Sequence, residues 1–194
     1  MNTVINTIVV GIIATLSFEI LKYFVLKVMD LIIESRIPFS LTGFWVAFSE
    51  SKHPDTHEIY SAYEFVRLRI ERGKIIVKIY QVTNDSRKHI YKGLGYLRGS
   101  KLSISYEDYS NPHSELCGSY NLRVSKKNEH STYLAGSYTE FQGKEDILYT
   151  HDYCLFPYVP TKKENLALRV FGKKYIFNLM ENNQFKEDVN KEML

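Results

Sequence analysis

Charged side chains are absent from the first 18 of the 194 residues, although 24% of the whole chain is charged. The opening Met1-Asn2-Thr3 has no positive residue either, which disfavours a cleavable secretory signal peptide. There are only two cysteines, Cys117 and Cys154, too few for a disulfide scaffold and too far apart for a clustered zinc site. We expect both thiols to be reduced and buried.

Motifs of the common enzyme classes are also absent. The chain contains no Gly-x-x-x-x-Gly-Lys phosphate loop, no His-Glu-x-x-His, no Cys-x-x-Cys and no Gly-x-Ser-x-Gly. Its six histidines are scattered, and its net charge of +3 does not give the strong positive field of a protein that binds DNA or RNA. We therefore predict a protein that is not an enzyme, with no catalytic residues, no metal and no cofactor.

The uncharged start belongs to a long apolar run from Val4 to Leu26. As a helix, these 23 residues would measure about 34 Å, enough to cross the hydrocarbon core of a bilayer once. We predict an N-terminal membrane segment over residues 1–36. The alternative is an amphipathic helix on the membrane surface, since Glu19 and Lys22 lie within the run and Lys27 follows it.

Basic residues follow this segment and none precedes it. Lys22, Lys27, Arg36 and Lys52 lie after or late in the apolar run, so the positive-inside tendency places the rest of the chain in the cytoplasm. A reducing compartment also agrees with two unpaired cysteines. We expect a membrane protein whose C-terminal part lies in the cytoplasm.

Small residues mark one strip of the membrane segment: Gly11, Ala14, Thr15 and Ser17. Such residues allow two membrane helices to approach closely, which indicates self-association, although small residues are common in any membrane helix. Glu19 lies close to the membrane boundary, where a carboxylate snorkels to water, pairs with Lys22, or meets a polar partner in a helix bundle.

Short β-rich segments separated by turn residues fill the region from 37 to 180. Apolar and charged residues alternate within them, as in Val66, Leu68 and Ile70 against Arg67 and Arg69. The predicted strands are Leu41–Ser49, Ile59–Glu71, Lys74–Thr83, Lys88–Arg98, Lys101–Tyr109, Ser114–Ser125, Ser131–Gln142 and Ile147–Phe156. Short connections and the absence of a crossover helix favour a mainly β fold, an eight-stranded antiparallel up-and-down β-barrel of the lipocalin or fatty-acid-binding-protein type. A sandwich is the alternative.

The C-terminal part is less regular. Leu166, Leu168 and Val170 alternate as in a strand, so we expect the stretch Asn165–Met180 to add or close a strand. Residues 181–194 are mostly polar and predict a solvated tail.

Tyrosines and basic residues recur together on the predicted strands. Arg67, Arg69, Arg98 and Arg123 lie near Tyr80, Tyr96, Tyr120 and Tyr138. Aromatic faces stack on nucleobases and guanidinium groups pair with phosphate oxygens, so this mixture suits a nucleotide. The same residue types also suit the outer face of a soluble barrel, and spacing alone leaves both interpretations open.

The order of a membrane segment, then Leu41-Thr42-Gly43-Phe44-Trp45, then a compact barrel resembles one family. It is similar to the transmembrane β-barrel effectors of CBASS, the bacterial cyclic-oligonucleotide anti-phage system. Gly43-x-Trp45 is similar to the Gly-x-Trp that opens a lipocalin barrel. The chain departs from the family in having one clear span, followed by an amphipathic stretch from Lys27 to Ser35, where two membrane helices are usual.

The resemblance implies a receptor and an effector in one chain. A cognate nucleotidyltransferase would make a cyclic dinucleotide on infection, the barrel would bind it, and the chain would oligomerise and disrupt the inner membrane, so that the infected cell dies. The basic side chains expected to hold the phosphates are Arg67, Arg69, Lys78, Arg98 and Arg123, and the rings expected to stack are Trp45, Tyr96 and Tyr120.

Two other functions remain open. The chain could be a membrane-anchored carrier or sensor whose barrel holds a small apolar ligand, as barrels of this size do. It could also be a structural membrane protein whose barrel only makes contacts.

Overall fold

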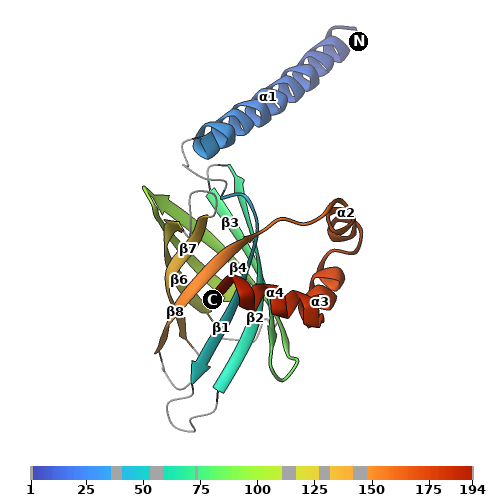
Figure 1. Ribbon diagram of the computed structural model, residues 1–194. Helices are drawn as coiled ribbons and strands as arrows, with labels where there is room; N and C mark the ends of the chain where they lie inside the picture. The colour runs from blue at the N-terminus through green and yellow to red at the C-terminus, as the bar shows by residue number, and fades with distance from the viewer. Residues whose placement is uncertain are drawn as a thin grey trace.

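A computed structural model describes residues 2–35, 41–52, 59–72, 74–110, 117–126, 132–141 and 148–193. The chain begins with one long helix, α1 (Asn2–Ser35), which projects away from a β-barrel (Figure 1). Within α1, the stretch Ile8–Ile32 is long and apolar enough to cross a membrane. The amphipathic stretch from Lys27 continues the same helix, so the described residues contain one candidate span.

Eight antiparallel strands follow and close into a barrel in simple sequential order, with β1 pairing with β8. The strands are β1 (Gly43–Lys52), β2 (Ile59–Glu71), β3 (Lys74–Thr83), β4 (Lys88–Arg98), β5 (Lys101–Asp108), β6 (Cys117–Lys126), β7 (Thr132–Phe141) and β8 (Leu148–Tyr158). The predicted eight-stranded up-and-down barrel is confirmed, and the sandwich was the wrong alternative. Residues 114–116, 131, 142 and 147 of the predicted strands lie outside the described residues.

The barrel has two distinct ends. We call the end where β1 begins and β8 ends the proximal end, because α1 precedes β1 in the chain; the opposite end is the distal end. At the proximal end Gly43 pairs with Leu68, and Phe44 with Tyr158. The Trp45 indole Nε1 donates to the Leu41 carbonyl at 3.0 Å, and both residues are buried. The segment before β1 therefore packs into the proximal end.

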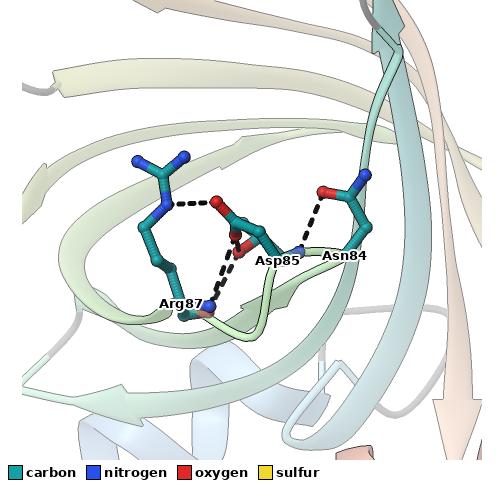
Figure 2. A network of polar contacts seen from close by, with 4 residues as sticks. Asn84, Asp85 and Arg87 are labelled. Carbon is teal, nitrogen blue, oxygen red and sulfur yellow. Dashed lines mark hydrogen bonds and ion pairs between the residues drawn. The ribbon is translucent and has the colours of Figure 1, made fainter.

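Turns at the distal end are held by local polar contacts. Between β3 and β4 the Asp85 carboxylate accepts from the Arg87 side chain and backbone, and the Asp85 backbone N–H donates to Asn84 Oδ1 at 3.1 Å (Figure 2). Hydrogen bonds from Thr83 and Arg87 lower the pKa of Asp85. Ser86 takes a positive φ of 63°, as this tight hairpin requires.

Three helices, rather than a strand and a tail, form the C-terminal part: α2 (Lys162–Phe171), α3 (Lys173–Glu181) and α4 (Asn183–Met193). A capping box between Thr161 and Glu164 starts α2. Met180, Phe185 and Val189 are buried against the outside of the barrel in a cluster with Phe65 of β2 and Tyr80 of β3. The expected strand over Asn165–Met180 and the solvated tail over 181–194 are therefore wrong, because apolar side chains one helical turn apart cover the barrel wall.

Candidate functional site: the lumen and the wall of the barrel

The lumen of the barrel changes in character from end to end. Near the proximal end it is filled by aliphatic side chains, among them Leu68, Val77, Leu102, Leu122 and Leu155, which pack with Trp45 in one buried cluster. Farther along, tyrosines from five consecutive strands form a second layer: Tyr91, Tyr106, Tyr120, Tyr138 and Tyr153. We call this layer the tyrosine belt. Tyr106 and Tyr153 stack on Tyr120 with ring centroids 4.8 and 4.7 Å away.

The tyrosine belt surrounds a buried acid, Glu64 of β2. Its carboxylate accepts hydrogen bonds from Tyr120 Oη at 3.1 Å, from Gln81 Nε2 at 3.0 Å and from Tyr153 Oη. Tyr91 Oη donates to Gln81 Oε1 at 3.1 Å, which extends the network to β4. Burial raises the pKa of Glu64 in spite of these hydrogen bonds, and it also raises the pKa of Tyr120 and of Tyr153.

Acidic groups continue toward the distal end. Burial and the charge of Glu64 raise the pKa of Glu140 to about 7. His89 Nδ1 lies 3.8 Å from the Asp108 carboxylate and stacks on Tyr91. Among the described residues, none of the buried side chains is a lysine or an arginine. Since a buried anion requires basic partners, the lumen does not suit a dianionic ligand.

The outer wall offers the opposite charge. Arg67 of β2 pairs in register with Lys78 of β3, and Lys78 pairs with Lys92 of β4. Residues in register share one face of a sheet, and the exposed Arg67 lies between buried neighbours, so this face is the outer one. We call these three residues the wall row. They span three strands, about 10 Å.

Few acids lie near the wall row in the described part of the chain: Glu107 of β5 is in register with Lys92, and the charge of Glu71 acts on Arg67. None of the ion pairs found there includes Arg67, Lys78 or Lys92. Desolvation and the neighbouring charge of Arg69 lower the pKa of Arg67. Like charges opposite one another weaken a sheet, so stability does not explain this arrangement.

Aromatic rings accompany each cation of the wall row. The Arg67 guanidinium lies 5.5 Å from the Phe44 ring centroid, Lys78 Nζ 5.0 Å from that of Tyr80, and Lys92 Nζ 3.1 Å from that of Tyr109. Tyr109 is well exposed, and a hydrogen bond from Lys92 lowers its pKa. The wall row thus combines cations that can contact phosphates with an accessible ring that can stack.

The residues selected from the sequence as ligand contacts divide into three places. Trp45 and Tyr120 are buried in the lumen, whereas Arg67 and Lys78 lie together in the wall row. Arg69 also points outward and is held by Glu71, with Nη1 and Oε1 3.0 Å apart. Tyr96, Arg98 and Arg123 are exposed close to the proximal end. The structure therefore separates Trp45 and Tyr120 from the basic residues and leaves Tyr96 on the same face as Arg98. The residues selected from the sequence did not include Lys92, Phe44 and Tyr109.

A groove of about 480 Å³ lies outside the barrel, between β1, β8 and the C-terminal helices. Apolar residues such as Val46 and Phe185 line it together with Glu164 and Asp188. The Tyr158 hydroxyl donates to Glu164 Oε1 at 2.7 Å. Two carboxylates against one lysine, Lys191, make this groove a poor place for phosphates.

The small strip of α1 is open. Gly11, Ala14, Thr15 and Ser17 are exposed, and an added Cβ at Gly11 would meet nothing within 4 Å. Thr15 Oγ1 donates to the Gly11 carbonyl at 2.9 Å, so the hydroxyl is satisfied within the helix. Glu19 pairs with Lys22 at 3.4 Å.

Both cysteines are free thiols, as expected, but neither is fully buried. Cys117 is exposed and Cys154 is half-buried, because both lie on strand positions that face away from the lumen.

Fold and site together define a closed eight-stranded antiparallel β-barrel that carries an N-terminal apolar helix and a row of three cations on its wall. The chain matches no family model, no curated protein and no solved structure.

Proposed function

We propose that this chain is a membrane-anchored effector that binds a cyclic dinucleotide on the outer wall of its barrel, oligomerises, and disrupts the bacterial inner membrane as part of a CBASS anti-phage response. The observation that carries the proposal is the wall row, three cations in register that form no ion pair among the described residues, although Glu107 continues the register beyond Lys92. A ligand with two phosphates supplies the anions that this row needs.

An outer-wall site also explains how a ligand could cause assembly. A ligand shifts an equilibrium only when it binds one state better than the other. Phosphates held on an exposed face remain accessible to a second copy, so a ligand shared by two barrels binds the assembled state more tightly than the single chain. The small strip around Gly11 and Thr15 then lets the α1 helices pack closely in the membrane.

The test is a ligand titration of the detergent-solubilised full chain with a panel of cyclic dinucleotides. At 100 times its dissociation constant, a ligand that binds one site stabilises the folded state by about 2.7 kcal/mol. We expect this stabilisation with at least one cyclic dinucleotide, and its loss in the double variant Arg67→Glu with Lys78→Glu.

The matched control is Arg98→Glu with Lys101→Glu, which removes the same charge from exposed wall positions near the proximal end. In detergent, this control variant is expected to be stabilised by the cyclic dinucleotide as much as wild type. Equal stabilisation of wild type and the Arg67/Lys78 variant, or none with any cyclic dinucleotide, would overturn the proposal.

A second candidate function, a carrier or sensor with its ligand in the lumen, is favoured by the tyrosine belt around Glu64. Aromatic faces with a hydrogen-bonding acid suit a small polar aromatic compound better than a lipid. An apolar ligand would leave the polar carboxyl group of Glu64 buried in apolar surroundings, which is unfavourable. Mass spectrometry of a solvent extract of the purified full chain tests it. A bound small molecule that is lost in Tyr120→Ala would support this second function over the first.

A further inference from the structure

The proximal end of the barrel lies close to the end of α1. Only five residues separate Ser35, the last residue of α1, from Leu41, which is buried beside Trp45. Even fully extended, this connection spans about 20 Å. When α1 crosses a bilayer through Ile8–Ile32, the proximal end must therefore lie within about 20 Å of the end of α1, which is three residues past that span.

Basic residues gather at this end of the barrel. Arg98 at the end of β4 pairs in register with Lys101 of β5, and Lys101 pairs with Arg123 of β6. These three exposed residues form the rim row. Further exposed cations at the proximal ends of their strands are Arg72, Lys74 and Lys126, against the single described acid Glu71, which is already paired with Arg69.

The distal end has no comparable excess of cations. Its described acids are Glu50, Asp85, Glu107, Asp108 and Glu140, and its described cations are Lys52, Arg87, Lys88 and Lys92. Arg87 and Lys88 are paired with Asp85 and Glu181, and Lys92 lies in register with Glu107. The excess of positive charge on the described strands therefore lies at the end toward α1, which the net charge of +3 for the whole chain conceals.

Helix α2 adds exposed apolar side chains at the same end. It follows β8, whose last residue Tyr158 pairs with Phe44 at the start of β1, and it stands out from the barrel wall (Figure 1). No residue of α2 is buried. Leu166, Val170 and Phe171 are 64%, 64% and 63% exposed, and Leu166 and Val170 lie one turn apart on the same face.

Cations surround these apolar side chains. The exposed basic residues of α2 and of the start of α3 are Lys162, Lys163, Arg169, Lys173 and Lys174. An amphipathic helix with apolar residues framed by lysine and arginine is typical of a helix that lies in the interface of an anionic membrane. Tyr96, 69% exposed and two residues before Arg98, adds an aromatic ring of the kind found at membrane interfaces.

We propose that the rim row and the apolar face of α2 form one docking surface for an anionic lipid leaflet, which holds the barrel against the membrane that α1 enters. Charge complementarity and continuity with α1 select lipid as the occupant: the surface lies at the end tethered to the membrane, and its positive charge matches anionic headgroups. This inference concerns the lipid surface alone and stands whether or not the wall row binds a cyclic dinucleotide.

The test measures whether α2 enters the interface of vesicles that contain the full chain. The label is an environment-sensitive fluorophore on Val170→Cys, in a background with Cys117→Ser and Cys154→Ser. Vesicles are made of phosphatidylcholine with or without phosphatidylglycerol, and quenching by nitroxide lipids reports contact with the bilayer. We expect strong quenching only with phosphatidylglycerol, and its loss at high salt.

Two controls make the result specific. A label on Ser86→Cys, in the distal turn, is expected to remain unquenched in both kinds of vesicle. The double variant Arg98→Gln with Lys101→Gln is expected to lower the ratio of docked to undocked barrels by about fivefold for each cation removed. The same change at the distal end, Arg87→Gln with Lys88→Gln, is expected to leave the ratio unchanged. Circular dichroism of each variant verifies the fold.

Two outcomes would overturn the proposal. One is equal quenching with and without phosphatidylglycerol. The other is seen in detergent, without vesicles: shielding of the fluorophore from water that increases with protein concentration. That result would show that a second copy of the chain covers α2. Because no cyclic dinucleotide is present, neither outcome bears on the ligand site.

Discussion

Tyr120 Oη donates a hydrogen bond to Glu64 Oε2 at 3.1 Å across the lumen, joining β6 to β2. This contact stands at the boundary between the aliphatic filling of the proximal half and the acidic distal half. It places a carboxylate and a ring inside the lumen, where no lysine or arginine is buried among the described residues. The cations that the ligand would need are on the outer wall instead, where Arg67 faces Lys78.

Glu140 is expected to make the free energy of unfolding fall as the pH rises. The pKa of Glu140 is raised from 4.5 to about 7, so the folded chain holds this proton more tightly than the unfolded chain does. Stability from this group is fully present below pH 4.5 and is lost as pH rises through about 7. We expect Glu140 to lower the free energy of unfolding by about 3 kcal/mol between about pH 5 and about pH 8.

Denaturant unfolding of the full chain in detergent at both pH values measures this effect. Glu140→Gln is expected to remove that part of the pH dependence, and Glu107→Gln, at an exposed position of β5, is expected to leave it in place. A Glu140→Gln profile parallel to that of wild type would contradict the burial of this group.

Close approach of two strands requires glycine at position 136. A Cβ added to Gly136 of β7 would collide with the backbone carbonyl oxygen of Asn121 in β6. We expect Gly136→Ala to destabilise the barrel by about 2 kcal/mol, since backbone cannot move aside as a side chain can. Gly95→Ala is the comparison, because its Cβ would meet side-chain atoms rather than backbone, Ile75 Cγ2 at 3.1 Å and Ile104 Cγ1 at 3.4 Å. Thermal unfolding should rank Gly136→Ala clearly below Gly95→Ala, and the reverse order would refute this strand packing.

The C-terminal helices are predicted to stabilise the barrel from outside. Met180 of α3 is fully buried in the cluster formed with the barrel wall. Met180→Ala should therefore lower the free energy of unfolding by about 3 kcal/mol through lost burial and the cavity left behind. Val170→Ala, on the exposed face of α2, should change it by less than about 0.5 kcal/mol. If both variants unfolded like wild type, α3 would not be packed as described.

Self-association of α1 should depend on its small strip. Gly11 leaves open space on the helix surface, and a larger side chain there would hold a partner helix away. We expect Gly11→Leu to weaken association of the full chain in bilayers by about fivefold, which corresponds to about 1 kcal/mol. Ile12→Leu, of nearly equal volume, is the control. Energy transfer between labelled chains gives the measurement, and equal transfer for both variants would exclude the strip as the interface.

Most of the barrel could be predicted from its sequence. Alternation such as Val66-Arg67-Leu68 and turns such as Asn84-Asp85-Ser86 determine strands locally, and short connections leave few topologies. The helices could not be distinguished in the same way, because Leu166, Leu168 and Val170 alternate like a strand. The sequence does contain one signal for a helix, the capping box formed by Thr161 and Glu164 at the start of α2.

The candidate site depended on information that spacing does not contain. Lys92 joins Lys78 only through the register of β3 with β4, and register is a long-range property of the sheet. Trp45 and Tyr120 were selected for their ring chemistry, yet their strand positions turn them into the lumen. Residue type therefore suggested the chemistry, and only the register showed which of these residues lie together.

The most direct test of a ligand-gated effector is leakage of a trapped dye from vesicles that contain the full chain, measured while a cyclic dinucleotide is added. We expect one member of a panel of cyclic dinucleotides to release the dye from wild-type vesicles, and the same ligand to release none from vesicles with Lys78→Glu. Leakage that is unchanged by every ligand, or equal in wild type and Lys78→Glu, would contradict a ligand-gated effector that acts through the wall row.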